Sequence, residues 1–581
     1  MTTPPSEDPA SGAAPVSVAG SVSSSGPVSS SGPVSSPATE AAVRLLTGLI
    51  AHGVRDIVLS PGSRSQALAL AAVALARSGS VRVHVRIDER VAGFTALGLG
   101  REAGVPAAVV CTSGTAAAGY LPAAMEAFHA GVPLILLTAD RPPELRGVGA
   151  NQATIQPGMY RPWARSSIDA PVPGEVDPTL FAELAADAVA VALGAPGEGL
   201  DGVAGPVHLN LPAREPLSGP MPDPLRAVLG SAPRLASGEP LRVRRGPRTL
   251  VVAGADAGPG AERIARAGGW PLVAEVVSGS RFGPHLVPAY RERLRDPALA
   301  DRIERVIVFG HPTLSREVAA LLRRTDLEAI VVRRGGERLN LSGVAVDARA
   351  VEVEASTGAD PDSVADAEAW LAAWTRPAAS SVDGAGTGAG RLLDRAALVR
   401  AVWAATGSDD RLLFGSSRIV RVADQALEGR DARVHANRGL AGIDGTIATG
   451  VGIALAAQSG GADRAREGAG GSGVTRVLLG DLSLLHDVGS LLLPGDEPAP
   501  RIQVVVGNDG GGTIFDGLEV AGTAATEDLD RAFYTPQSVA LAPLAAAYGW
   551  AHARAATPDE LVRALSAEVA GPQLIEVPLA R

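Results

Sequence analysis

The sequence predicts an α/β protein with three consecutive domains, each built on a parallel sheet flanked by helices, and preceded by a disordered tail. Three observations predict this fold class. At 581 residues the chain is too long to fold around one hydrophobic core. Short runs of branched and leucine side chains alternate with helix-like segments of about 10–15 residues, the pattern of parallel strands with helical crossovers. Polar, glycine-containing loops follow these runs, and in parallel sheets ligands bind beyond the carboxyl ends of the strands.

Composition excludes several classes of protein. The net charge is −10, so nothing in the overall charge favours binding to nucleic acid or to an anionic membrane. The apolar runs are strand-sized or broken by Gly and Pro, so we expect no membrane span and a cytoplasmic protein. Cys111 is the single cysteine, which excludes a disulfide within the chain. The chain has no lysine, so all 52 basic residues are arginines, which bind carboxylates bidentately.

The elements follow in order along the chain. Residues 1–37 are rich in Ser, Gly and Pro and predict a disordered tail, for which the sequence suggests no function. The first domain, predicted over 38–225, begins with the helical pattern TEAAVRLLTGLIAHG. Its strands are predicted in DIVLS, VRVHVRI, AAVVC and PLILLTADR.

Two further blocks of the same kind complete the chain. The central domain is predicted over 245–375, with strands in RTLVVAG, ERVIVFG and EAIVVRR. The last domain is predicted over 390–581, with strands in RLLFGSS, RVLLGD, IQVVVGND and QLIEVPL. Residues 214–245 are rich in Pro, Gly and Arg, and residues 376–390 are rich in Gly, Ala and Ser, so both are predicted to be linkers.

Two carboxylates suggest a metal site in the last domain. Asp481 follows the strand run VLLG, and Asp509 follows IQVVVGN, with room between them for a helix and a return strand. One carboxylate from each strand end, together with glycine carbonyls, would suit Mg²⁺, which prefers oxygen ligands and keeps some positions for phosphate. Whether Asn508 or Asp509 provides the second side-chain ligand stays open from spacing alone.

The string GDL followed by GNDGGG resembles the diphosphate and metal motif of thiamine diphosphate enzymes, although Leu482 and Asp509 replace a glycine and an asparagine of that motif. The resemblance implies the thiamine diphosphate-binding fold, with thiamine diphosphate and Mg²⁺, or Mn²⁺ as an alternative, as cofactors. It also implies that Asp481, Asp509 and the carbonyl of Gly511 are the metal ligands, with Gly480 beside the diphosphate. Glu89, in RIDER, resembles the catalytic glutamate that hydrogen-bonds the cofactor's pyrimidine.

Four longer segments narrow the resemblance: SPGSRSQALALA, TSGTAAAGYLPA, LTADRPPELRGVGANQATIQPGMY and NRGLAGIDGTIATGVGIALA. Together they resemble the 2-succinyl-5-enolpyruvyl-6-hydroxy-3-cyclohexene-1-carboxylate synthases of menaquinone biosynthesis. That family decarboxylates 2-oxoglutarate and adds the product to isochorismate in a 1,4-addition. The resemblance therefore implies these two substrates, and a homodimer or homotetramer with active sites at the subunit interface.

The same resemblance assigns substrate and cofactor contacts. Isochorismate-side contacts are implied for Ser63, Arg64, Arg141, Asn151 and Gln152. Contacts to the succinyl side or the acceptor are implied for Ser417, Arg421 and Arg438, and the central domain is expected to add Arg316. Ile443 is expected beneath the cofactor, and Ile514 and Phe515 are expected to wall the pocket, Ile514 towards the cofactor and Phe515 towards the substrate.

Two alternatives remain from the sequence. One is another thiamine diphosphate decarboxylase or carboligase, such as an acetolactate synthase. The other is a non-catalytic nucleotide-binding regulator, because GVGIALA resembles part of a dinucleotide-binding glycine loop. That segment lacks the full glycine spacing and a preceding strand, which argues against a dinucleotide site.

Overall fold

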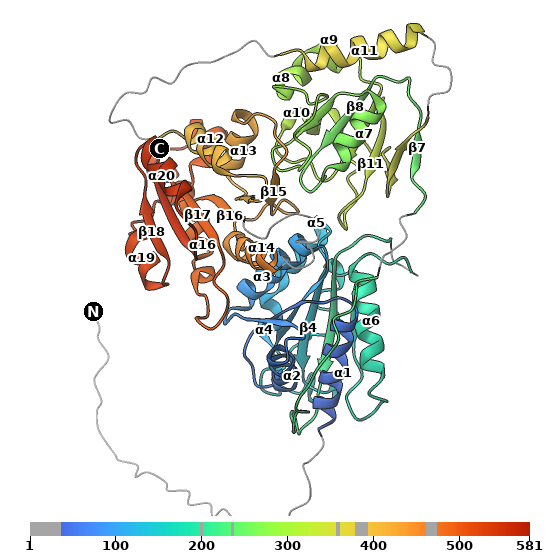
Figure 1. Cartoon of the computed structure of the whole chain (residues 1–581), viewed down its shortest axis with the longest axis vertical. Coiled ribbons are helices and arrows are strands. Elements are labelled where there is room, and N and C mark those ends of the chain that lie inside the picture. Colours follow the sequence, from blue (N-terminus) through green and yellow to red (C-terminus); the bar gives the residue numbers. More distant parts are fainter. Residues whose placement is uncertain are drawn as a thin grey trace, which may run out of the picture.

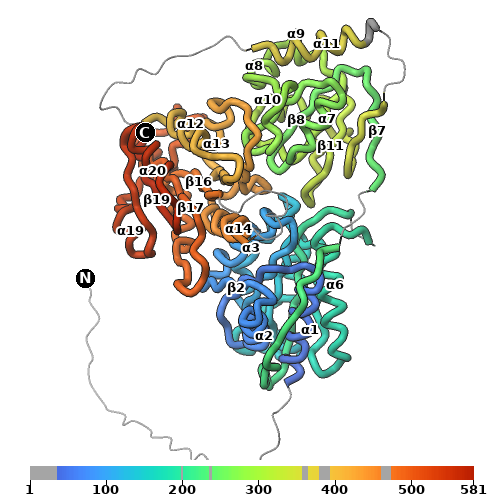
Figure 2. Tube along the Cα trace, in the orientation of Figure 1, coloured from blue at the N-terminus to red at the C-terminus, as the bar shows by residue number. Residues whose placement is uncertain are grey.

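A computed structural model describes residues 36–197, 201–233, 238–355, 361–377, 393–459 and 473–580. The predicted tail 1–37 lies outside the described residues except for Ser36 and Pro37, which begin the first helix. The predicted linker 376–390 also lies outside them, except for its first two residues. The chain forms three helix-flanked blocks that follow one another in sequence (Figures 1 and 2). The predicted fold class is confirmed.

The first block contains a six-stranded parallel sheet in the order β2-β1-β3-β4-β6-β5. Its helices start and stop at recognisable signals: Ser36 caps α1 by accepting from the Thr39 N–H, and Gly104 ends α3 in a left-handed conformation. The strands are β1 (Asp56–Leu59), β2 (Arg82–Val85), β3 (Ala107–Cys111), β4 (Leu134–Asp140), β5 (Ser166–Asp169) and β6 (Pro206–Pro212). The helices are α1 (Pro37–Ala51), α2 (Gln66–Arg77), α3 (Glu89–Ala103), α4 (Thr115–Gly119), α5 (Leu121–Ala130), α6 (Leu180–Ala192), η1 (Pro143–Leu145) and η2 (Arg161–Trp163).

The central block contains a five-stranded parallel sheet in the order β12-β11-β10-β8-β9, beside a two-stranded parallel pair of β7 and β13. Strand β7 lies in the segment predicted as a linker, which is therefore not wholly irregular. The strands are β7 (Leu241–Val243), β8 (Thr249–Ala253), β9 (Leu272–Ala274), β10 (Arg305–Phe309), β11 (Glu328–Val332), β12 (Val346–Ala348) and β13 (Val351–Val353). The helices are α7 (Gly260–Gly268), α8 (Tyr290–Arg295), α9 (Pro297–Ala300), α10 (Arg316–Leu321) and α11 (Pro361–Thr375).

The last block repeats the six-stranded parallel design in the order β15-β14-β16-β17-β19-β18. The strands are β14 (Arg411–Phe414), β15 (Arg433–Ala436), β16 (Thr475–Gly480), β17 (Ile502–Asn508), β18 (Ala551–Arg554) and β19 (Gln573–Pro578). The helices are α12 (Arg395–Ala405), α13 (Arg418–Ala426), α14 (Thr446–Ser459), α16 (Asp481–His486), η4 (Val488–Leu491), η5 (Thr513–Gly517), α17 (Val520–Thr523), α18 (Thr526–Leu529), η6 (Asp530–Tyr534), α19 (Leu541–Ala547) and α20 (Pro558–Ser566).

Helices α3 and α14 join the first and last blocks, and they lie side by side between the two sheets (Figure 1). Both are buried along most of their length, and one hydrophobic cluster includes side chains from both helices and both sheets. Glycines allow the close approach. A Cβ on Gly98 would lie 2.1 Å from the Thr449 carbonyl oxygen, and a Cβ on Gly452 would lie 2.1 Å from the Thr95 carbonyl oxygen. None of the described helices is long and apolar enough to cross a membrane.

We expect Gly452→Ala to lower the free energy of unfolding by ~1–3 kcal/mol, the usual cost of overpacking a tight core. The added methyl group cannot fit without moving α3 away from α14. Chemical denaturation followed by circular dichroism would measure the loss. Gly522→Ala is the matched control, because a Cβ there meets no atom within 4 Å. Equal stability of the two variants would contradict this account of the contact.

Candidate active site

The two predicted metal-site carboxylates follow neighbouring strands of the last sheet. Asp481 comes directly after β16 and Asp509 directly after β17, and these strands pair with Gly480 opposite Gly507. Asp481 is buried, and the Leu482 and Gly511 N–H groups hydrogen-bond to it. Burial, followed by the negative charge of Asp509, raises the pKa of Asp481 to about 6. The structure thus brings Asp481, Asp509 and Gly511 together.

Asp509 rather than Asn508 faces Asp481. The Asn508 side chain donates to Glu576 on the neighbouring strand β19, with 3.1 Å between Nδ2 and Oε1. Asp509 instead accepts from Thr513 Oγ1 at 2.6 Å and from Arg395 Nη2 at 2.6 Å. Arg395 was not predicted as a site residue. It is the first residue of α12, and nothing in the sequence pattern links it to Asp509.

The donor set fits a hard divalent cation. Two carboxylates repel each other at this edge of the sheet, and a cation between them would remove that repulsion. Nothing would meet a Cβ on Gly510 within 4 Å, so the loop is open at the residue that follows Asp509. Gly511 has φ +137°, and a Cβ there would lie 2.2 Å from the Tyr534 carbonyl oxygen, so only glycine fits. In the described part of the chain, no three His, Cys, Asp or Glu side chains gather as a metal cage.

Glu89 lies at the carboxyl edge of the first sheet, where α3 begins. Asp88 caps this helix by accepting from the Arg90 N–H at 2.8 Å, so Glu89 is held in the first turn. Its side chain is half-buried beside Gly119, where a Cβ would lie 2.8 Å from that of Glu89. The next residue, Arg90, donates to the carbonyl of His486 at 3.0 Å. The helix that starts at Glu89 therefore contacts the end of α16, the helix that starts at Asp481.

Four of the residues predicted on the isochorismate side are connected around the ends of β1, β3 and β4. Arg141 donates to the Asn151 carbonyl at 2.6 and 2.9 Å, and Gln152 Nε2 donates to the Ser113 carbonyl at 2.8 Å. Arg64 is buried, and burial together with the positive charge of Arg141 lowers its pKa. Ser63 is exposed beside Arg64.

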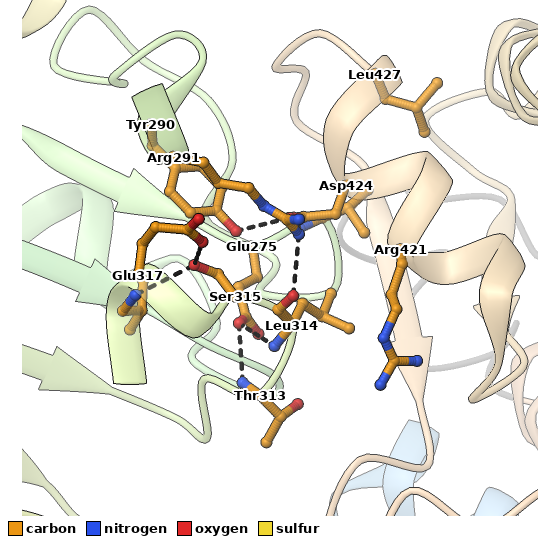
Figure 3. A network of polar contacts seen from close by, with 12 residues as sticks. Glu275, Tyr290, Arg291, Thr313, Leu314, Ser315, Glu317, Arg421, Asp424 and Leu427 are labelled. Atoms are coloured by element: carbon orange, nitrogen blue, oxygen red, sulfur yellow. Dashed lines mark hydrogen bonds and ion pairs between the residues drawn. The ribbon is translucent and has the colours of Figure 1, made fainter. Parts of the chain in front are cut away.

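A second group of predicted residues lies where the last block meets the central block. The guanidinium of Arg438 is buried and donates to Thr313 Oγ1 at 2.7 and 2.9 Å. Arg421 lies on α13, opposite the central-block loop that contains Thr313 and Leu314 (Figure 3), and it donates to the Ser417 carbonyl at 3.0 Å. Arg316 is exposed at the start of α10. Among the described residues, no hydrogen bond or ion pair joins this group to the isochorismate-side group.

The apolar site residues are half-buried, as a pocket wall would be. Phe515 packs edge-to-face on Phe533, with 5.2 Å between ring centroids, and Ile514 precedes it in η5. Arg418 ties this loop to α13 by donating to the Thr513 carbonyl at 2.8 Å. Ile443 lies in the turn before α14. The segment GVGIALA is the interior of α14 and not a loop after a strand, which removes the basis for a dinucleotide-binding site.

Comparisons with known proteins agree with this architecture. Residues 39–159 match the family described as thiamine pyrophosphate enzyme, N-terminal TPP binding domain. The chain also resembles benzoylformate decarboxylase from Polynucleobacter necessarius, with a TM-score of 0.63 and 16% sequence identity over 94% of this chain and 98% of the other. At that level of identity the likeness shows the fold alone.

Curated relatives are much more similar in sequence to this chain than the decarboxylase is. A 2-succinyl-5-enolpyruvyl-6-hydroxy-3-cyclohexene-1-carboxylate synthase from Leifsonia xyli subsp. xyli is 52% identical, over 94% of this chain and 97% of the relative. The synthase of that name from Clavibacter michiganensis subsp. michiganensis is 50% identical over the same shares. The one from Kineococcus radiotolerans is 43% identical over 94% and 96%. The chain therefore belongs to the 2-succinyl-5-enolpyruvyl-6-hydroxy-3-cyclohexene-1-carboxylate synthases, a family of thiamine diphosphate-dependent enzymes.

Proposed function

We propose that this enzyme decarboxylates 2-oxoglutarate and adds the resulting succinyl unit to isochorismate, giving 2-succinyl-5-enolpyruvyl-6-hydroxy-3-cyclohexene-1-carboxylate and CO₂ in menaquinone biosynthesis. The observation that carries the proposal is the pair of carboxylates, Asp481 and Asp509, at adjacent strand ends of the last sheet. The names of relatives that match nearly the whole chain support the choice of substrates.

The proposal gives each group of residues a task. Asp481, Asp509 and the carbonyl of Gly511 would hold Mg²⁺, or Mn²⁺ in its place, against the cofactor's diphosphate, and Gly480 leaves room for that diphosphate. When bound, thiamine diphosphate supplies the carbon nucleophile that decarboxylation of a 2-oxo acid requires. Glu89 would hold a proton against the pyrimidine nitrogen of the cofactor, and Ile443 and Ile514 would shape its seat.

Arginines would bind and orient the substrates' carboxylates. Arg421 and Arg438, with Ser417, form the group proposed for the succinyl donor or the acceptor, and Arg316 and Phe515 would border it. Ser63, Arg64, Arg141, Asn151 and Gln152 are the group proposed for isochorismate. The positive charge of Arg141 near Arg64 supports this, because two neighbouring guanidinium groups repel each other and an anion bound between them would offset that repulsion. Positioning of this kind lowers the barrier by removing the entropic cost of bringing reactants together.

The proposal includes a cytoplasmic homodimer or homotetramer with its active sites between subunits. Exposed apolar side chains near the site support the presence of a partner surface. Ile87 is 69% exposed two residues before Glu89, and Ile155 is 86% exposed in the loop that follows Gln152. Each of these side chains would be buried if another chain packed against the site, which is why they support the proposal.

The activity can be tested by following the loss of isochorismate absorbance with 2-oxoglutarate, with and without thiamine diphosphate and Mg²⁺. We expect turnover only when both cofactors are present, and a strong preference for 2-oxoglutarate over pyruvate, because pyruvate lacks the second carboxylate that an arginine would bind. Equal or better use of pyruvate would indicate an acetolactate synthase-like enzyme instead.

We expect Glu89→Gln to reduce kcat by on the order of 10²-fold or more, the range typical of losing a group that acts in proton transfer. Because Gln has nearly the same shape, the cofactor should still bind, and calorimetry with thiamine diphosphate would verify this. Asp88→Asn tests the neighbouring cap position and should retain most activity, since Asn is also a good helix cap. Full activity of Glu89→Gln would remove Glu89 from the mechanism.

Asp481→Asn should weaken binding of thiamine diphosphate in the presence of Mg²⁺, because it removes one charge from the proposed cation site. We expect the Kd for thiamine diphosphate to rise about tenfold or more, as is typical when a charged hydrogen-bonding group is lost. Isothermal titration calorimetry with and without Mg²⁺ would measure it. Asp528→Asn, an exposed residue on α18, is the control with the same chemical change. A loss that is the same in EDTA as in Mg²⁺ would argue against a metal at Asp481.

A further inference from the structure

Arg438 is held by contacts from two other blocks of the protein. It follows β15 in the last block, is 3% exposed, and places its guanidinium on the central-block residue Thr313. Nε and Nη2 both donate to Thr313 Oγ1, while Nη1 has no hydrogen-bond partner among the described residues. A buried N–H group without a partner is costly, and a ligand carboxylate at that position would satisfy it.

Glu275 holds the loop that receives Arg438. This residue follows β9, is fully buried, and accepts at Oε1 from the Thr313 N–H at 2.8 Å and the Leu314 N–H at 2.6 Å (Figure 3). These two short hydrogen bonds to Glu275 Oε1 fix the backbone of Thr313. The hydroxyl oxygen of Thr313 accepts from Arg438. Ser315, which follows Leu314, caps α10 by accepting from the Val318 N–H. Glu275 therefore acts on Arg438 through Thr313.

Glu126 holds the backbone on the other side of Arg438. It lies on α5 of the first block and is 3% exposed. Its Oε1 accepts from the Gly439 N–H and its Oε2 from the Leu440 N–H, both at 2.8 Å. Gly439 is needed for this approach, because a Cβ there would lie 2.9 Å from the Cβ of His129 and 3.0 Å from Oε2 of Glu126. Each carboxylate oxygen of Glu126 thus accepts a hydrogen bond from one of the two residues that follow Arg438.

We propose that Glu126 and Glu275 are positioning residues that together fix Arg438, one through its backbone and the other through its guanidinium, so that Nη1 faces a substrate carboxylate. The inference rests on the proposed function for the role of Arg438 as a substrate contact. The contacts that fix Arg438 stand independently of that role. The arrangement explains why two acidic side chains are buried beside an arginine without forming a direct hydrogen bond to its guanidinium.

Both carboxyls are poised to titrate within the working range of an enzyme. Burial, with the charge of Asp256, raises the pKa of Glu126 to about 7 against the opposing effects of Arg101 and the two N–H donors. Burial, with the charge of Asp424, raises the pKa of Glu275 to about 8 against Arg438 and its N–H donors. A proton on Glu126 converts one of its two acceptor oxygens into a hydroxyl and weakens a bond to Gly439 or Leu440. Fixing of Arg438 by Glu126 is therefore fullest above pH 7 and declines as the pH falls below it.

The kinetic test compares Glu126→Gln and Glu275→Gln, alone and combined with Arg438→Gln. Each single Glu variant should raise KM for 2-oxoglutarate about tenfold and change kcat less than about threefold, since ground-state binding is what positioning affects. In the Arg438→Gln background, each should add less than about twofold, because coupled residues are not additive. In the wild-type enzyme we expect kcat/KM to fall as the pH drops below about 7, where Glu126 gains a proton. This decline should disappear in Glu126→Gln.

Glu262→Gln is the matched control: Glu262 is equally buried, lies on α7 and pairs with Arg266 of its own helix. It should leave the kinetic constants unchanged. The positioning role would be overturned if the Glu126 and Glu275 variants lost as much kcat/KM in the Arg438→Gln background as in the wild-type background. It would also be overturned if these variants lowered kcat and left KM unchanged.

Hydrogen exchange separates this inference from the proposed function. In Glu126→Gln the amides of Gly439 and Leu440 should exchange at least about tenfold faster, because their hydrogen bonds to Glu126 are weakened. In Glu275→Gln the amides of Thr313 and Leu314 should exchange faster by a similar factor for the same reason. Glu275→Gln should also speed exchange over residues 436–442, because the loop that it holds contacts Arg438 through Thr313 and His311. No change there would overturn the inference, even if the enzyme converts its proposed substrates. If the wild-type enzyme fails to convert them, the function is wrong and the exchange result still decides whether Arg438 is fixed in this way.

Discussion

The arrangement of the site depends on the close contact between α3 and α14. It brings backbone against backbone at Gly98 and Gly452, and no side chain larger than hydrogen fits at either position. Helix α3 begins at Glu89, and α14 follows the turn that contains Ile443. One packing contact therefore sets the position of the residue proposed for proton transfer and of the residue proposed beneath the cofactor. Because the core is shared between two sheets, these positions cannot shift independently.

A buried charge connects the central block to the last block, beside an apolar cluster that the two blocks share. Asp424, on α13 of the last block, accepts from Arg281, Arg291, Tyr290 and the Val276 N–H of the central block (Figure 3). A carboxylate taken out of water is costly unless its lone pairs are satisfied, and here both oxygens are. Such a contact is directional, so it defines how the central block is oriented and, with it, where Thr313 meets Arg438.

The fold was predictable because its signals are local, whereas much of the site was not. Strands such as β3 and β4 are continuous apolar runs, but β6 reads PVHLNLP, and the edge strands β15 and β18 read RVHA and AHAR, where polar and small residues hide the pattern. Asp481 and Asp509 were predictable because each directly follows a strand. Arg395, Glu126 and Glu275 were missed because their partners are distant in sequence, as Asp509 is from Arg395. Pairings of this kind are set by tertiary packing, which a single sequence does not display.

The absence of lysine has a consequence for how this site responds to its surroundings. A guanidinium keeps its charge across the whole pH range in which proteins are folded, so the arginines proposed to bind the substrates would keep a constant positive charge. His311, beside the Arg438 carbonyl, has a pKa lowered by burial and stays neutral near pH 7. The buried acids Glu126 and Glu275 are groups near Arg438 whose charge can change close to neutral pH. Evolution of a different working pH in this family could proceed by exchanging buried carboxyls while the arginines proposed to bind the substrates are left in place.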